Sequence, residues 1–120
     1  MRRRVLIIDD HASFRRLATK LLEAGGFAVI GEAEDGRAGL AEARRLQPDI
    51  VMLDVLLPDT NGFAVAQALT EGAAAPVVIL VSSRSASDIA PALDRSPAQG
   101  FIPKRELTAA AFAAVVDGRV

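Results

Sequence analysis

The chain has 120 residues, of which 51% are hydrophobic, enough for one compact domain with its own core but too few for two. Its net charge of −1 and pI of about 5.8 disfavour nucleic acid and anionic membranes as direct partners. The basic run at residues 2–4 could contact phosphate, but such a run more often lies in solvent at the start of a strand. The chain lacks cysteine and any stretch long enough for a signal peptide or a membrane span, so we expect a cytoplasmic protein without disulfides or thiolate metal sites.

Short apolar runs rich in β-branched residues alternate along the chain with segments of helical periodicity. The runs show little alternation with polar residues, as in strands that are covered on both faces. We expect five strands, at residues 5–8, 28–30, 50–53, 77–81 and 100–103. We also expect five helices, at residues 14–22, 38–46, 63–70, 89–94 and 107–116, of which the first stops at Gly25 and Gly26 and the second before Pro48.

Five repeats of strand and helix predict an α/β fold, a doubly wound, five-stranded parallel sheet with five helices on its two faces. The whole chain, residues 1–120, is expected to form this one domain. The fourth helix is the least regular of the predicted elements, because Pro91 lies inside it. With Ser87 as the N-cap, Pro91 would close the first turn, and a short or irregular helix would end before Ser96.

Carboxylates follow two of the expected strands. In an open parallel sheet, ligands bind beyond the carboxyl ends of the strands, where the strand order reverses. Asp9 and Asp10 follow the first strand and Asp54 follows the third, and these strands are neighbours in a 2-1-3-4-5 order. Three close carboxylates repel one another unless a hard dication joins them, and Mg²⁺ prefers such oxygen ligands. We therefore expect Mg²⁺ at these residues, with the Asp54 carboxylate as a nucleophile toward a phosphoryl group.

A lysine and a serine at two further strand ends fit the same chemistry. Only Lys20 and Lys104 are lysine among 14 basic residues, so Lys104 offers a compact charge for Asp54 and then for a phosphate oxygen. Ser82, after the fourth strand, could donate a hydrogen bond to the same phosphate. Taken singly, these side chains have plainer explanations as a helix cap, a turn residue, a loop hydroxyl or a solvated charge. Four suitable strand ends in the right order are harder to explain in that way.

These segments together resemble the response-regulator receiver domains, over essentially the whole chain. The matching segments are IIDD at residues 7–10, PDIVMLD at 48–54, PDTNG at 58–62, residues 78–82, and GFIPK at 100–104. Each segment alone is weak, whereas all of them at this spacing are highly specific. The resemblance implies a flavodoxin-like sheet with strand order 2-1-3-4-5.

The resemblance also implies a role for each site residue. Asp54 would accept the phosphoryl group from a phosphohistidine on a sensor histidine kinase or a phosphotransfer protein. The Mg²⁺ ligands would be Asp10, Asp54, the backbone carbonyl of Leu56 and, mainly through water, Asp9. Lys104 and Ser82 would contact the phosphate, Ser82 and Phe101 would switch position, and Leu56 and Arg84 would tune the lifetime of the phosphate.

A receiver domain reports phosphorylation through its surface. The resemblance implies that the fourth helix, fifth strand and fifth helix bind a downstream protein, or a second copy of the chain, after phosphorylation. It implies no enzymatic activity beyond the domain's own phosphorylation and slow dephosphorylation. Phe101 could equally be ordinary core, and His11 is expected only to form a loop or to begin a helix.

Two other functions stay open from the sequence. A receiver-like adaptor could bind partners without phosphorylation, and an irregular fourth helix at Pro91 would favour it slightly. A small phosphatase could also use an aspartate nucleophile with Mg²⁺, but it would normally carry Asp-x-Asp after its first strand, where this chain has the adjacent pair Asp9 and Asp10. The chain ends soon after the fifth helix, so we expect either a stand-alone receiver, which the length of 120 residues favours, or a domain cut from a longer regulator.

Overall fold

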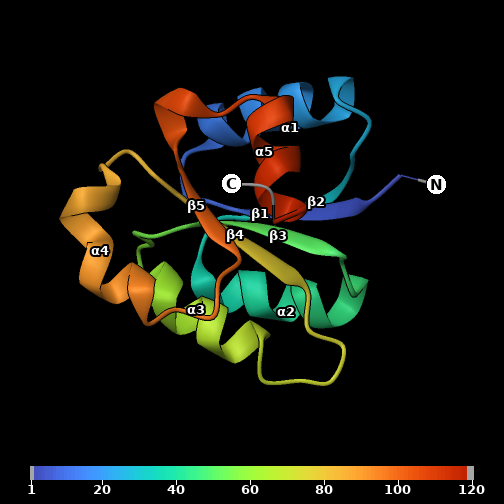
Figure 1. Cartoon of the computed structure of the whole chain (residues 1–120). Coiled ribbons are helices and arrows are strands. Elements are labelled where there is room, and N and C mark those ends of the chain that lie inside the picture. The colour runs from blue at the N-terminus through green and yellow to red at the C-terminus, as the bar shows by residue number, and fades with distance from the viewer. Residues whose placement is uncertain (1, 119–120) are drawn as a thin grey trace.

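A computed structural model describes residues 2–118 and shows a five-stranded parallel sheet between two layers of helices (Figure 1). The strand order is β2-β1-β3-β4-β5, which confirms the predicted flavodoxin-like α/β fold. The strands are β1 Arg4–Ile8, β2 Ala28–Ala33, β3 Ile50–Asp54, β4 Val77–Ser82 and β5 Gly100–Pro103. The helices are α1 Ala12–Ala24, α2 Gly36–Leu46, α3 Gly62–Leu69, α4 Ala86–Asp94 and α5 Ala109–Val116, with a 3₁₀ turn at Lys104–Glu106.

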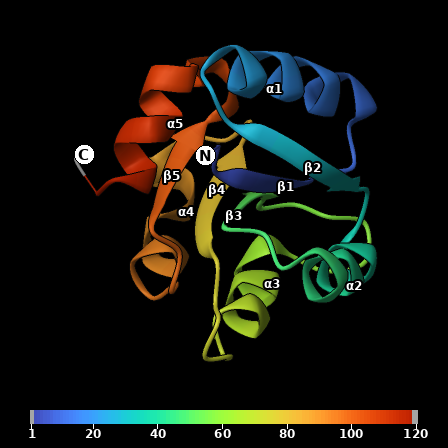
Figure 2. The same ribbon diagram turned by 90° about the vertical axis from the view of Figure 1, so that its right-hand side faces the viewer.

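The helices divide between the two faces of the sheet. Figures 1 and 2 show α1 and α5 on one face and α2 and α3 on the other, with α4 beside them near β5. Alternate residues of the central strands supply the two cores, because side chains along a strand point to opposite faces. Val5 and Ile7 pack toward α1 and α5, whereas Leu6 and Ile8 pack toward α2 and α3.

The core under α1 and α5 is built around an aromatic pair. Phe112 is fully buried, and its ring meets Phe27 edge-to-face with the centroids 5.1 Å apart. This arrangement adds to the free energy of area burial, because the ring edge of one aromatic faces the ring face of the other. No helix within residues 2–118 is long and apolar enough to span a bilayer.

Most elements differ from the prediction by one to three residues at one end or both, and two of these differences have a clear physical cause. The strand β2 continues to Ala33, beyond the predicted end at residue 30, because its backbone keeps pairing with β1 after a register shift between Val5 and Leu6. The helix α5 begins at Ala109, later than the predicted residue 107, because the Thr108 side chain accepts a hydrogen bond from the N–H of Ala111 and so caps the helix there.

The fourth helix is more regular than its proline suggested. Its N-cap is Ser85 and not Ser87, since the Asp88 carboxylate accepts hydrogen bonds from the Ser85 N–H and hydroxyl. This earlier start places Pro91 in the second turn, and the helix continues through it to Asp94, ending before Ser96 as predicted. The helix is therefore continuous through Pro91, but with 9 residues it is shorter than α1 and α2, as expected of a short fourth helix.

Candidate functional site

The ends of β1 and β3 bring the predicted carboxylates together. Ile8 lies opposite Leu53 in the parallel register, so the residues that follow these two strands meet at one edge of the sheet. Asp9, Asp10, His11 and Asp54 each offer a ligand atom, and these atoms lie within 4.8 Å of one another. We call these four residues the acidic cluster. The three aspartates are therefore placed as the sequence predicted.

Burial makes the charge on this cluster unfavourable. Asp9 is fully buried and Asp54 is 4% exposed, whereas Asp10 lies at the surface. Burial raises the pKa of Asp54 above its ordinary value, and the nearby charge of Asp9 raises that pKa further. The Lys104 ammonium and the N–H of Leu56 act in the opposite direction, since both favour the ionised carboxylate. On balance the pKa of Asp54 is raised, so the site disfavours the ionised form of this carboxyl.

Lys104 is the cation inside this edge of the sheet. It follows β5, and its Nζ lies 2.7 Å from Oδ2 of Asp9 and 3.2 Å from Oδ2 of Asp54. The ammonium also stands 4.4 Å from the ring centroid of Phe14, on α1, in a cation–π contact. Its side chain is only 15% exposed, so the ammonium is held at the carboxylates rather than in solvent.

The residues fit a hard dication. Three carboxylates face one ammonium, which leaves two negative charges uncompensated when His11 is neutral. Asp9 Oδ2 is buried and has no hydrogen-bond partner of good geometry among residues 2–118, although Lys104 lies close to it. Oxygen ligands with excess negative charge are the set that Mg²⁺ prefers in proteins.

The loop between β3 and α3 carries Leu56 and is fixed at both of its ends. The Leu56 N–H donates to Oδ1 of Asp54 over 3.3 Å, and Leu56 itself forms an isolated bridge with Asn61. Asn61 caps α3 by accepting a hydrogen bond from the N–H of Ala64, so the helix begins at Gly62, one residue before the predicted start. A Cβ on Gly62 would lie 2.4 Å from the carbonyl oxygen of Asp54, so the chain can pass this close only without a side chain.

The other predicted residues surround the cluster at the neighbouring strand ends. Ser82 ends β4, is buried, and accepts a hydrogen bond from the N–H of Arg84 over 3.0 Å. Arg84 is exposed, and so is Leu56, whose relative exposure is 53%. Phe101 lies opposite Leu80 in the β4–β5 register and packs, partly buried, against the core under α2 and α3.

The sheet order, the strand-end chemistry and the spacing of the segments agree with one family of proteins. The model described as "Response regulator receiver domain" matches residues 5–116. The chain belongs to this family. Protein-glutamate methylesterase/protein-glutamine glutaminase 6 of Anaeromyxobacter dehalogenans is 40% identical, over 86% of this receiver domain and 32% of the relative. DNA-binding response regulator MtrA of Mycobacterium tuberculosis is 39% identical, over 87% of this receiver domain and 45% of that protein.

Solved structures match the receiver domain over nearly its whole length. A LuxR-family two-component response regulator from Aurantimonas superposes with a TM-score of 0.86 at 27% identity, over 99% of this chain and 88% of the other. The CheX–CheY–BeF3–Mg²⁺ complex from Borrelia burgdorferi matches with a TM-score of 0.80 at 27% identity, over 94% and 85% of the two chains. This receiver domain spans less than half of the two curated relatives above, so their further activities are properties of those proteins.

Three side chains around the cluster were not predicted as site residues. Arg15 donates through Nη1 to the backbone carbonyl of Asp9, and through Nε to Glu32 of β2 over 2.7 Å. Asp59 accepts from the N–H groups of Gly36 and Arg37, and so ties the β3–α3 loop to the start of α2. These hydrogen bonds lower the pKa of Asp59, since they favour its charged form.

The third side chain is His11. It is the N-cap of α1, as the helix-start prediction had it, but its imidazole faces the carboxylates and makes no side-chain hydrogen bond to the helix. The sequence could have indicated Arg15. It lies four residues after His11, and one turn of helix places both residues near the end of the first strand. The direction of a side chain at an N-cap has no such periodic signal.

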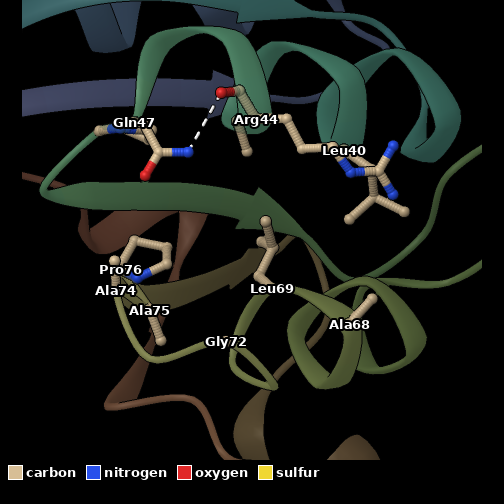
Figure 3. Close-up of a pocket in the computed structure, with 11 residues that line it drawn as sticks. Leu40, Arg44, Gln47, Ala68, Leu69, Gly72, Ala74, Ala75 and Pro76 are labelled. Atoms are coloured by element: carbon tan, nitrogen blue, oxygen red, sulfur yellow. Dashed lines mark hydrogen bonds between the residues drawn. The ribbon is translucent and has the colours of Figure 1, made fainter.

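A separate hollow of about 230 Å³ lies at the opposite end of the sheet (Figure 3). Pro48 and Pro76, which precede β3 and β4, help to line it, together with Leu40 and Arg44 of α2 and Leu69 of α3. Figure 3 shows small and apolar side chains around it, with a hydrogen bond from Gln47 to the Arg44 carbonyl. It lies at the amino ends of the strands, whereas the acidic cluster lies at their carboxyl ends, so it is not part of the receiver site.

Proposed function

We propose that this receiver domain accepts a phosphoryl group on Asp54, with Mg²⁺ as the cofactor, from the phosphohistidine of a sensor histidine kinase or a phosphotransfer protein. The observation that carries the proposal is the position of Asp54. Its carboxylate is buried between Asp9 and Lys104 and has a raised pKa. A dication and a phosphoryl group would compensate the excess charge that this environment disfavours. The Mg²⁺ and BeF3 in the CheX–CheY complex of B. burgdorferi support the same chemistry for a related fold.

The proposed transfer is an in-line displacement. An oxygen of the ionised Asp54 carboxylate donates an electron pair to phosphorus as the bond from phosphorus to the donor imidazole nitrogen breaks. The electron pair of that bond returns to the imidazole, which takes up a proton. Lys104 favours the ionised carboxylate before transfer and can then pair with a phosphate oxygen, because its Nζ lies 3.2 Å from Oδ2 of Asp54.

The ligands proposed for Mg²⁺ are Asp10, Asp54 and the backbone carbonyl of Leu56, with Asp9 acting through water. When bound, Mg²⁺ supplies positive charge to the carboxylates and to the phosphoryl oxygens. Asp10 is the surface-exposed carboxylate of the acidic cluster, so a hydrated cation can approach it without opening the fold. Arg15 and Asp59 position this site through the carbonyl of Asp9 and through the β3–α3 loop.

The response to phosphorylation is proposed to pass through Ser82 and Phe101. Ser82 would donate its hydroxyl to the phosphate, giving up the hydrogen bond that it accepts from the Arg84 N–H. Phe101 would turn inward, and the face formed by α4, β5 and α5 would then bind a downstream protein or a second copy of the chain. Leu56 and Arg84, both exposed beside the site, are proposed to set the lifetime of the phosphate. We propose that residues 1–120 act as one cytoplasmic receiver domain with no other enzymatic activity.

The test is phosphorylation with a small phosphodonor, such as phosphoramidate, in the presence and absence of Mg²⁺. We expect intact mass to show one added phosphoryl group on the wild-type chain with Mg²⁺, and none after chelation. Asp54→Asn should abolish the addition, whereas Asp94→Asn, an exposed change at the far end of α4, should leave it intact. Unchanged labelling of Asp54→Asn would show that another residue accepts the phosphoryl group, and an unlabelled wild type would favour the adaptor function instead.

A further inference from the structure

The imidazole of His11 stands among the oxygens of the acidic cluster. Its Nδ1 lies 3.2 Å from Oδ1 of Asp9, 3.1 Å from Oδ1 of Asp10 and 4.0 Å from Oδ2 of Asp54. We propose that His11 is an additional ligand for transition-metal dications, for the borderline ions Co²⁺ and Ni²⁺ and also for Mn²⁺, so that this site takes these ions in addition to Mg²⁺. The inference deepens the proposed function and rests on it for the position of the cation.

The separations match the spacing of ligand atoms around one ion. In an octahedral site with metal–ligand distances of about 2.1 Å, adjacent ligand atoms are about 3 Å apart and opposite ones about 4.2 Å apart. The contact of Nδ1 with Oδ1 of Asp10, at 3.1 Å, has the length of adjacent ligands. The contact with Asp54, at 4.0 Å, is close to that of an opposite ligand. Nδ1 therefore stands at ligand spacing from Asp10 and Asp54, the two carboxylates proposed to bind the cation directly.

The ring of His11 contacts the cluster itself, including a hydrogen bond of Nδ1 with Oδ1 of Asp9 that a cation would replace. Its backbone N–H donates to Oδ1 of Asp9 over 2.8 Å, which fixes where the side chain begins. The side chain is 63% exposed and caps no N–H of α1, so a cation would not take it from a structural contact in the helix. His11 is also the single histidine of a chain that has no cysteine, so an imidazole signal from a bound metal has one source.

Ligand chemistry sets the selectivity that follows. Carboxylate, carbonyl and water oxygens suit Mg²⁺ and Mn²⁺, whereas an imidazole nitrogen adds most to the binding of Ni²⁺, Co²⁺ and Zn²⁺. An imidazolium at this position would instead weaken metal binding, because its positive charge beside Asp9 and Asp10 would compete with every dication. The two roles therefore predict opposite effects of removing the imidazole.

The experiment is a calorimetric titration of the untagged, full chain with Mg²⁺ and with Ni²⁺, on the wild type, His11→Gln and Asp10→Asn. We expect His11→Gln to weaken Ni²⁺ binding by about tenfold or more while Mg²⁺ affinity stays the same. Asp10→Asn should weaken both ions. Equal losses for Ni²⁺ and Mg²⁺ in His11→Gln, no loss for either, or tighter binding of both would overturn the assignment.

A second readout separates ligation from any indirect effect. Pulsed EPR of Mn²⁺ bound to the wild type should show hyperfine coupling to an imidazole nitrogen, and His11→Gln should lose it. Mn²⁺ bound with no nitrogen coupling in the wild type would contradict the proposal. Both measurements omit a phosphodonor, so their failure would leave phosphorylation at Asp54 standing, and the failure of phosphorylation would leave the metal selectivity standing.

Discussion

The same strands form the most favourable and the least favourable parts of this receiver domain. Within β1 and β3, fully buried aliphatic side chains such as Ile8 and Leu53 pack into the core. One residue further along, the equally enclosed Asp9 and Asp54 carry charge, with Lys104 as their cation. Burial stabilises the first group and destabilises the ionised second group. Burial of the aliphatic side chains in the sheet's interior therefore offsets the destabilising effect of the buried carboxylates at its carboxyl edge.

The largest expected effect lies in the core. Phe112→Ala removes a fully buried ring and its edge-to-face contact with Phe27, and should lower the free energy of unfolding by about 3–5 kcal/mol. Chemical denaturation followed by circular dichroism measures it. The matched control is Leu17→Ala on α1, whose residue is 52% exposed, and which should change stability by less than about 1 kcal/mol. Similar losses in both variants would show that Phe112 is not the centre of that core.

The next effect has the opposite sign. Asp54→Asn removes one of three clustered carboxylates, so we expect it to stabilise the metal-free domain by on the order of 1 kcal/mol at neutral pH. The gain should be smaller in Mg²⁺, because the dication stabilises the wild type more than the variant. The same denaturation curves, with and without Mg²⁺, test this expectation. A destabilised metal-free Asp54→Asn would mean that the ion pair with Lys104 outweighs the repulsion.

The pH dependence of that difference follows from the raised pKa of Asp54. Below the ordinary carboxyl pKa of 3.8, Asp54 is protonated in both the folded and the unfolded chain and costs no stability. As the pH rises through the raised folded pKa, the unfolded chain ionises more readily than the folded one, so the wild type loses stability. The advantage of Asp54→Asn should therefore open above pH 3.8 and reach a plateau. A difference that is constant with pH would contradict the raised pKa.

The smallest effect concerns Asp59, a surface carboxylate that connects the β3–α3 loop to the start of α2. Asp59→Ala removes the acceptor of the Gly36 and Arg37 N–H groups, and should lower the melting temperature slightly while slowing phosphorylation, since the β3–α3 loop is no longer tied to α2. The lowered pKa of Asp59 means that its contribution is present above the ordinary carboxyl pKa and is lost as the pH falls through the lowered value. Asp59→Asn, which keeps one side-chain oxygen, is the control. Its melting temperature and phosphorylation rate should lie between those of the wild type and Asp59→Ala.

The sequence predicts most of this fold because its signals are local and repeated. Continuous apolar runs mark the strands, and the polar residue after each run marks the edge where a ligand binds. That rule is enough to bring together Asp9, Asp10, Asp54 and Lys104, which the structure places in contact or within one cluster. Element lengths are harder to predict where pairing or capping decides them, as at the end of β2 and at Ser85.

The unpredicted contacts are long-range or depend on side-chain direction. Asp59 caps a helix that begins 23 residues earlier in the chain, a relation that no periodicity reveals. His11 was predicted to form a loop or to begin a helix, and it is the N-cap of α1, but nothing in the spacing of residues indicates that its imidazole turns toward the carboxylates. The proline at position 91 gave a wrong helix start. The capping interaction of Ser85 with Asp88 begins the helix earlier than predicted, so that Pro91 lies in its second turn.

The central claim is that Asp54 carries the phosphoryl group. The most direct measurement is borohydride reduction of the phosphorylated domain, which converts an aspartyl phosphate into homoserine, followed by tandem mass spectrometry of the peptides. The account predicts homoserine at position 54 only, formed only when Mg²⁺ was present during phosphorylation. Homoserine at Asp9, Asp10 or Asp59, or at position 54 at the same yield after chelation, would contradict it.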